Sequence, residues 1–250
     1  MYILTLAIYK SIWYIIIKEG DKKLKQKCKG ERKMKKLNVN INGNKKLINT
    51  SSVRFMIWNL PAVVTCPFAT EHCKHFCYAR KAERVYPQVL PAREKNLKDS
   101  MEEDFVDNMV YTIESRLNSK AFKNKKVYFR IHESGDFYNQ KYTNAWCDIA
   151  RHFENNSNIT FLAYTKSVKY ILNARVPKNL IVRFSIWDDT KQSDIESANS
   201  LNLPIYTAGT KEEVQKAVEN NGFTKCECAD CANCGKCYSA DEKKIMCEIH

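Results

Sequence analysis

From Leu37 to Gly222 the chain alternates between short apolar runs and longer segments with a helical pattern, and this alternation constrains the fold most. Short apolar runs bounded by turn residues predict buried strands, and an apolar residue at every third or fourth position predicts a helix packed on them. Strands that alternate with helices favour a parallel sheet with right-handed crossovers. We therefore predict an α/β fold of about five to six β–α units, either a partial (β/α) barrel or an open parallel sheet.

The predicted strands are Phe55–Val64, Val127–His132, Ile159–Tyr164, Leu180–Trp187 and Pro204–Ala208. The predicted helices are Ala92–Leu117, Lys141–Phe153, Val168–Ala174, Gln192–Leu201 and Lys211–Asn221, the last ended by Gly222 as a glycine cap. Before them, Val39 and Ile41 followed by Asn42-Gly43 predict a short hairpin. Ligand sites in parallel sheets gather at the carboxyl ends of the strands, where this chain places many of its polar residues.

Three closely spaced cysteines follow the first predicted strand: Cys66, Cys73 and Cys77, with the spacing C-x6-C-x3-C. Thiolates bind zinc and iron–sulfur clusters. Three thiolates satisfy three irons of a [4Fe–4S] cluster and leave the fourth iron open. The alternative is zinc, with His72 or His75 as the fourth ligand.

A second group of cysteines occupies residues 223–250, which we treat as a Cys-rich metal-binding tail. Its predicted metal ligands are Cys226, Cys228, Cys231, Cys234 and Cys237. Successive C-x2-C spacings are typical of ferredoxin-type cluster loops and also of zinc knuckles, so either metal fits. Eleven cysteines without a secretory signal favour metal binding in a reducing interior over disulfides.

Residues 1–36 form an apolar and then Lys-rich arm ahead of the predicted metal-binding domain, residues 37–222. The apolar run at residues 1–17 allows a short membrane anchor or an interfacial segment. We favour a start of translation at Met34, which would place the arm outside the native protein. The net charge of +13 is concentrated in residues 1–54, and from Phe55 onward Lys and Arg nearly balance Asp and Glu. The charge alone is therefore weak evidence for nucleic-acid binding.

A cysteine loop after the first strand of a β/α repeat resembles the radical S-adenosylmethionine enzymes, although their usual spacing is C-x3-C-x2-C. In that superfamily the cysteines hold a [4Fe–4S] cluster whose open iron binds the cofactor's amino and carboxylate groups. The resemblance implies that Ser134, Gly135 and Asp136 lie near the cofactor's amino group, and that Arg183 and Ser185 contact its ribose and carboxylate. Lys166 is expected to neutralise a carboxylate, and the tail is similar to auxiliary-cluster extensions.

The chain also resembles the phage-encoded gene product 88-like family over roughly residues 48–237. The matching features are Cys66-Pro through Cys77-Tyr78-Ala79, the run Arg130 to Phe137, Tyr164 to Ser167, and the cysteine tail.

Together these features favour an iron–sulfur protein of the radical S-adenosylmethionine type that acts on an unidentified substrate and needs an electron donor. Two other hypotheses stay open: a zinc-stabilised adaptor that binds nucleic acid or protein, and an iron–sulfur redox sensor without turnover. The expected location is the cytoplasm of a phage-infected host, with membrane attachment only if residues 1–17 are an anchor.

Overall fold

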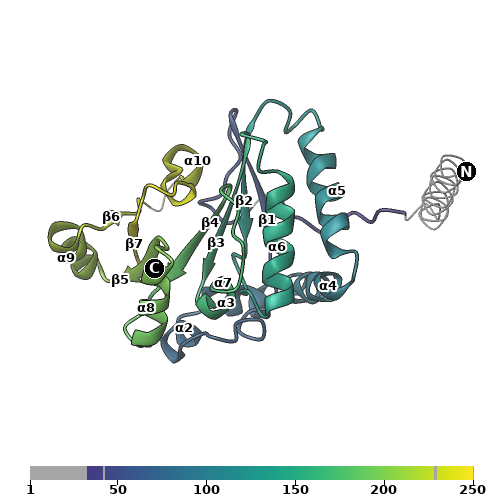
Figure 1. The fold of residues 1–250 in the computed structure, drawn as a ribbon. Helices are drawn as coiled ribbons and strands as arrows, with labels where there is room; N and C mark the ends of the chain where they lie inside the picture. Colours follow the sequence, from purple (N-terminus) through teal and green to yellow (C-terminus); the bar gives the residue numbers. More distant parts are fainter. Residues whose placement is uncertain (1–32, 42, 228–229, 250) are drawn as a thin grey trace, which may run out of the picture. The chain divides into compact units, whose positions relative to one another are not determined.

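The computed structural model describes residues 33–41, 43–227 and 230–249 (Figure 1). These residues contain one seven-stranded sheet in the order β1-β2-β3-β4-β5-β7-β6, with every neighbouring pair parallel. The sheet is an open half-barrel that alternates with helices, so the predicted α/β class is confirmed.

The strands are β1 (Val53–Trp58), β2 (Lys126–Ile131), β3 (Ile159–Thr165), β4 (Leu180–Ser185), β5 (Ile205–Gly209), β6 (Thr224–Lys225) and β7 (Lys244–Glu248). The helices are α2 (Glu71–His75), α3 (Tyr78–Val85), α4 (Val89–Met101), α5 (Phe105–Leu117), α6 (Gln140–His152), α7 (Val168–Ile171), α8 (Gln192–Ser200), α9 (Lys211–Asn221) and α10 (Cys231–Cys234), with a 3-10 turn, η1 (Lys236–Tyr238). Gly222 ends α9 in the left-handed conformation, with φ 65°, as its position predicted.

Helices α5 and α6 cover one face of the sheet (Figure 1), and the core on that face is rich in aromatic side chains. Trp58 packs against Phe105 with ring centroids 5.6 Å apart, and Phe129 packs against Phe161 at 5.2 Å. All four side chains are almost fully buried. Each such side chain stabilises the fold by about 1.5–3 kcal/mol relative to exposure.

The other face of the sheet is covered by the Cys-rich tail, and Figure 1 shows α10 and α6 on opposite sides of the strands. Tyr238 stacks on Tyr128 with centroids 4.0 Å apart, and both rings pack near Phe55. Cys231 and Cys237 pack against this second core. After η1 the chain enters the sheet as β7, between β5 and β6, a strand that the sequence pattern did not predict.

Three local predictions are wrong. The helix predicted over 92–117 is two helices, because Glu102 ends α4 in an extended conformation (ψ 149°) and Asp104 precedes α5. An acidic side chain is unfavourable at the C-terminus of a helix, where the helix dipole is negative, and favourable at the N-terminus of the next helix, where the dipole is positive. The first strand ends at Trp58 rather than Val64. Within the described ranges no hairpin forms around Gly43, and Asn40 instead makes an isolated antiparallel bridge with Ile57.

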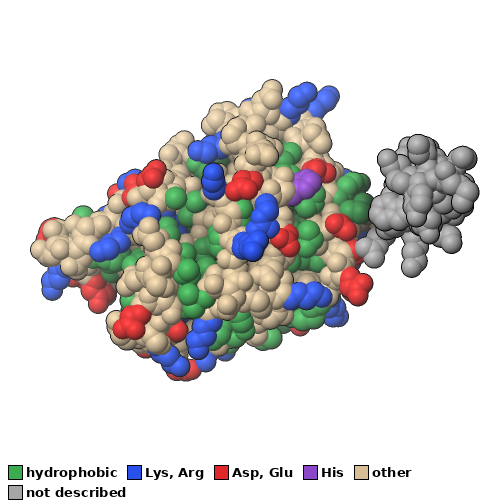
Figure 2. Space-filling view, viewed as in Figure 1, with side chains coloured by type: hydrophobic (Ala, Val, Ile, Leu, Met, Phe, Trp, Pro, Cys, Tyr) green, Lys and Arg blue, Asp and Glu red, His purple; other side chains and the backbone are tan. Residues whose placement is uncertain are grey.

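The predictions for residues 1–32 lie outside the described residues. In the part of the chain that is described, no helix has both the length and the apolar content to cross a membrane. On the face drawn in Figure 2, Lys and Arg side chains are interspersed with Asp and Glu, in keeping with the near balance of charge beyond residue 54.

Candidate functional site

The loop after β1 is bonded to the loop after β2 at the carboxyl edge of the sheet. The Leu60 amide donates to the Ser134 carbonyl, and the Ser134 hydroxyl donates to the Leu60 carbonyl, each at 2.9 Å. The Asn59 side chain accepts from the amides of Glu133 and Ser134 at 2.7 and 3.1 Å. The cysteine loop and the predicted Ser-Gly-Asp motif are therefore held side by side, as their positions after neighbouring strands predicted.

Gly135 is required at this junction. Its φ is +90°, a conformation that L side chains rarely adopt. A Cβ atom at Gly135 would lie 2.7 Å from both the Leu60 Cβ and the Thr65 Oγ1. The glycine thus permits a close approach between the two loops.

Of the three thiols, Cys73 lies on the short helix α2, whereas Cys66 and Cys77 lie in the loop outside the helices. Thr70 caps α2 by accepting from the Cys73 amide at 3.2 Å, and Cys77 precedes α3. Burial, together with the smaller effects of the charges of Asp136, Cys73 and Cys77, raises the pKa of the Cys66 thiol to about 12. Burial also raises the pKa of Cys73. The three thiols are therefore electrostatic neighbours of one another and of Asp136.

The spacing of these thiols bears on the choice of metal. Among the described residues, the one trio of metal-ligating side chains whose ligand atoms all lie within 4.8 Å of one another is His72, Asp188 and Asp189. Tetrahedral zinc with bonds of about 2.3 Å places its thiolates about 3.8 Å apart. Cys66, Cys73 and Cys77 do not form such a trio, so at least one pair of their sulfur atoms lies more than 4.8 Å apart. An iron–sulfur cluster, which carries each thiolate on a different iron, suits a wider arrangement.

Asp136 is buried beside the cysteine loop. Its carboxylate accepts from the Thr165 hydroxyl at 2.6 Å, from the Phe137 amide at 2.7 Å and from the Lys166 amide at 2.9 Å. Burial raises the pKa of Asp136 to about 6, although these hydrogen bonds favour the charged form. The carboxylate thereby ties the end of β2 to the end of β3.

Lys166 is 6% exposed, and its ammonium donates to the Ser185 carbonyl at 2.7 Å. Burial lowers the pKa of Lys166 to about 8, and the neighbouring charges of Cys73, Asp136 and Asp189 act in the opposite direction. The structure therefore brings the predicted residues Lys166 and Ser185 to the same edge as Cys73. Ser185 contributes its backbone oxygen there.

Arg183 lies elsewhere. Its side chain is fully buried on the tail-covered face of β4, and it donates to the carbonyl oxygens of Lys236, Cys237, Ser239 and Glu242 at 2.7–3.1 Å. The prediction that Arg183 contacts a cofactor at the cysteine loop is therefore wrong, because its guanidinium hydrogen bonds hold the tail instead.

Among the tail cysteines, Cys231 and Cys237 pack over the middle of the sheet, whereas Cys226 follows the edge strand β6. Asp230 caps α10 by accepting from the Ala232 and Asn233 amides, and the Cys231 amide donates to the Lys46 carbonyl at 3.0 Å. Cys237 lies within electrostatic reach of Cys234 and of Arg183. Cys226 is also described, whereas the predicted ligand Cys228 lies outside the described residues.

The sequence pattern did not anticipate the contact between α2 and the end of β4. The His72 imidazole pairs with Asp188, and the His72 amide donates to the Asp189 carboxylate at 2.8 Å. The His72 ring also stacks on Trp187, with centroids 4.8 Å apart. His72 is therefore turned toward β4, and the only signal for this in the sequence was an acidic pair after a predicted strand.

A model of the family described as "Gene product 88" matches residues 22–240 of this chain. The chain is 32% identical over 126 residues to the Gene 88 protein of Mycobacterium phage D29, covering 48% of this chain and 51% of that protein. It is 29% identical over 192 residues to the Gene 88 protein of Mycobacterium phage L5, covering 70% of this chain and 78% of that protein. The chain thus spans about half the length of the D29 protein and more than two thirds of the L5 protein. No solved structure matches it.

Proposed function

This chain belongs to the gene product 88 family of phage proteins, and we propose that it is an iron–sulfur enzyme of the radical S-adenosylmethionine type. One observation carries the proposal. Three thiols on the loop after β1 lie beside the Ser134–Asp136 loop and Lys166, at the carboxyl edge of a parallel half-barrel. Strand ends of this kind are where α/β folds bind their ligands.

The residues present fit a [4Fe–4S] cluster on Cys66, Cys73 and Cys77. The donor set is three thiols, which leaves one iron for a small-molecule ligand. Burial of Cys66 and Cys73 limits access of water, and their raised pKa values mean that loading the metal releases protons. When bound, a reduced cluster of this kind supplies one electron to the sulfonium group of S-adenosylmethionine and so starts hydrogen abstraction from a substrate.

The chain's own residues would bind and orient that cofactor. The Lys166 ammonium, which is held toward the edge by the Ser185 carbonyl, supplies positive charge for a carboxylate. Ser134 and Asp136 use their side chains to join strand ends, so their contribution is to hold the loop in shape. An external one-electron donor completes the set of partners, and a reducing host cytoplasm suits a protein with so many thiols.

The tail supports a second metal centre, either a second cluster or zinc, on Cys226, Cys228, Cys231, Cys234 and Cys237. Burial raises the pKa of Cys237, and the nearby charges of Arg183 and Arg130 act in the opposite direction. These cations partly offset the cost of burying a thiolate there and so support metal binding.

The test is the metal content of anaerobically purified protein. We expect iron and sulfide in comparable amounts, a visible absorption band, and a paramagnetic signal after reduction that changes when S-adenosylmethionine is added. Cys73→Ala and Cys77→Ala each remove that signal. Cys147→Ala is the matched control, because Cys147 is buried in the core on α6 and belongs to neither group of cysteines.

Zinc in both sites and no iron after anaerobic reconstitution would refute the proposal and favour the zinc-stabilised adaptor. Iron whose reduced spectrum ignores S-adenosylmethionine would favour the redox sensor instead.

A further inference from the structure

The segment immediately after the cysteine loop exposes an unusual combination of side chains. On α3 and its two flanks, aromatic rings and cations alternate on the surface. We call these residues the α3 face: Phe76, Tyr78, Arg80, Lys81, Arg84 and Tyr86. Phe76, Tyr78 and Tyr86 are 49%, 63% and 53% exposed. Exposed large apolar side chains that cluster in this way mark interaction sites more often than isolated ones do.

The charge of the α3 face has one sign. From His72 to Arg93 the only acidic residue is Glu83, whose side chain is 13% exposed and accepts from Arg93 at 2.8 Å. Arg80, Lys81 and Arg84 are exposed, and none of them forms an ion pair with a described residue. Three cations are thus available to an anionic partner.

The acidic side chains that border this face are already engaged. Glu71 pairs with Lys74 at 2.7 Å, and Asp188 pairs with His72. The Asp189 carboxylate accepts from the backbone of α2. These pairings reduce the repulsion that an incoming anion would meet.

Two of the exposed rings are held in place by contacts inside the protein. The Tyr78 hydroxyl donates to the Glu133 carbonyl at 2.6 Å, and burial of that hydroxyl raises the pKa of Tyr78 to about 12, while its ring stays largely exposed. Phe76 stacks in parallel with Trp187, with centroids 6.3 Å apart and planes inclined by 14°. A ring that is already ordered loses little entropy when a flat ligand stacks on it.

We propose that the α3 face binds single-stranded nucleic acid and presents it to the cysteine centre. Its cations match a phosphate backbone, and its exposed rings match unpaired bases, a combination typical of single-strand binding sites. Bases of a duplex are stacked on each other and cannot use the rings. The binding of single strands does not depend on the proposed function. Only the presentation of the strand to the cysteine centre rests on it, because Tyr78 directly follows Cys77.

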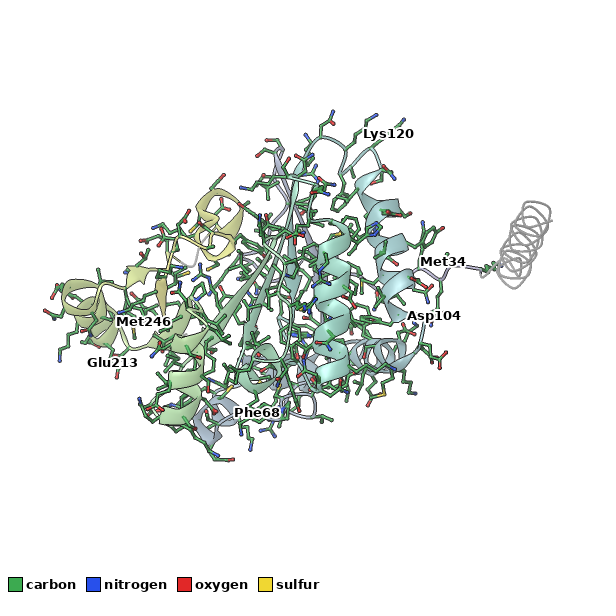
Figure 3. All side chains as sticks on the ribbon, viewed as in Figure 1. Met34, Phe68, Asp104, Lys120, Glu213 and Met246 are labelled. Carbon is green, nitrogen blue, oxygen red and sulfur yellow. The ribbon has the colours of Figure 1, made fainter. Side chains whose placement is uncertain are left out.

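The test is fluorescence anisotropy of a labelled twelve-nucleotide oligothymidine with the full chain, titrated at several salt concentrations. The triple variant Arg80→Gln, Lys81→Gln, Arg84→Gln should weaken binding about tenfold or more, and should make the salt slope shallower by about 2, given about 0.7 per phosphate contact. The matched control is Arg116→Gln, Lys120→Gln, Lys123→Gln, which removes the same charge from exposed positions at the end of α5 and after it. Figure 3 places Lys120 and the loop residue Phe68 at opposite ends of the domain. Because all variants keep residues 1–33, any binding by that basic arm cancels in the comparison.

Stacking is tested separately with Tyr86→Ala, which should weaken oligothymidine binding roughly tenfold. Tyr111→Ala, a 37% exposed ring on α5, is its control and should have no effect. An equal loss in both triple variants, or equal affinity for duplex and single strand, would overturn the inference. The inference would also be overturned if the protein bound anionic phospholipid vesicles but not oligonucleotide, and if the α3 triple variant abolished that vesicle binding. Iron content is measured on the wild type and on every variant. A wild-type protein that contains iron but does not bind oligothymidine would overturn this inference alone and leave the proposed function standing.

Discussion

Removal of the Arg183 guanidinium tests how the tail is held on the sheet. In Arg183→Met, four carbonyl oxygens lose their donor at once: those of Lys236, Cys237, Ser239 and Glu242. No described carboxylate forms an ion pair with Arg183, so these carbonyls are its main compensation for burial. The substitution keeps an apolar side chain of similar length and removes the donors and the charge.

The expected cost follows from these contacts. A hydrogen bond from a charged donor contributes about 1.5–3 kcal/mol, and four would sum to about 6–12 kcal/mol. That sum is an upper bound, because the guanidinium no longer has to be desolvated and the carbonyls of a detached tail regain water. We therefore expect a loss of about 3–5 kcal/mol, confined mainly to opening of residues 230–249.

Hydrogen exchange measures this opening directly. Amides of β7, and those between η1 and β7, should exchange about a hundredfold faster or more in Arg183→Met, while those of β2 and β3 change little. Arg183→Lys keeps the charge but reaches fewer carbonyls, so it should give an intermediate rate. Unchanged protection of β7 in the Met variant, with weaker S-adenosylmethionine binding at the cysteine loop, would refute this account and restore the cofactor role predicted from the sequence.

Three further predictions concern single residues. Gly135→Ala should destabilise the protein by about 2 kcal/mol or more, because φ is +90° and the new Cβ lies 2.7 Å from Leu60 and Thr65. Denaturant unfolding and iron retention measure this loss, and a neutral effect would contradict the close approach of the two loops. Burial lowers the pKa of His132 to about 3. The stability that this neutral imidazole contributes is present above pH 6.5 and should be lost as the pH falls toward 3, by up to about 5 kcal/mol. Urea unfolding across that range should show a flatter dependence on pH for His132→Asn, because asparagine tolerates the positive φ of this site. Thr210→Ala removes the capping box at the start of α9 and should cost about 1 kcal/mol in thermal or urea unfolding, whereas Thr210→Ser should cost little.

The main layout of the fold was predictable because burial imposes a visible period. Strands β2, β3 and β4 are apolar runs that begin and end within a few residues of their predicted bounds. The end of α9 was predicted for a local reason, since Gly222 acts within one turn of the helix. The capping box of Thr210 at its start was not predicted, although it is equally local. The break between α4 and α5 was missed because Leu97, Met101 and Phe105 continue the helical spacing of apolar residues across it in the sequence, although Met101 is 58% exposed in the structure.

The meeting of the cysteine loop with residues 134–136 was predictable for a topological reason. Parallel strands end at one edge of a sheet, so residues that follow neighbouring strands must lie close together. The direction of Arg183 was not predictable in this way. Alternation along a strand tells which residues share a face, but not which face looks toward the tail.

By itself, the sequence determined the α/β class, the order of strands and helices, and the grouping of the cysteines, because hydrophobic period and short-range spacing depend only on nearby residues. The tertiary structure decided where the second cysteine group lies, since β7 enters the sheet between β5 and β6 and draws the tail across the strands. It also decided that His72 turns to Asp188 and that the rings of the α3 face stay exposed. These outcomes depend on contacts between segments far apart in the chain, which no local pattern records.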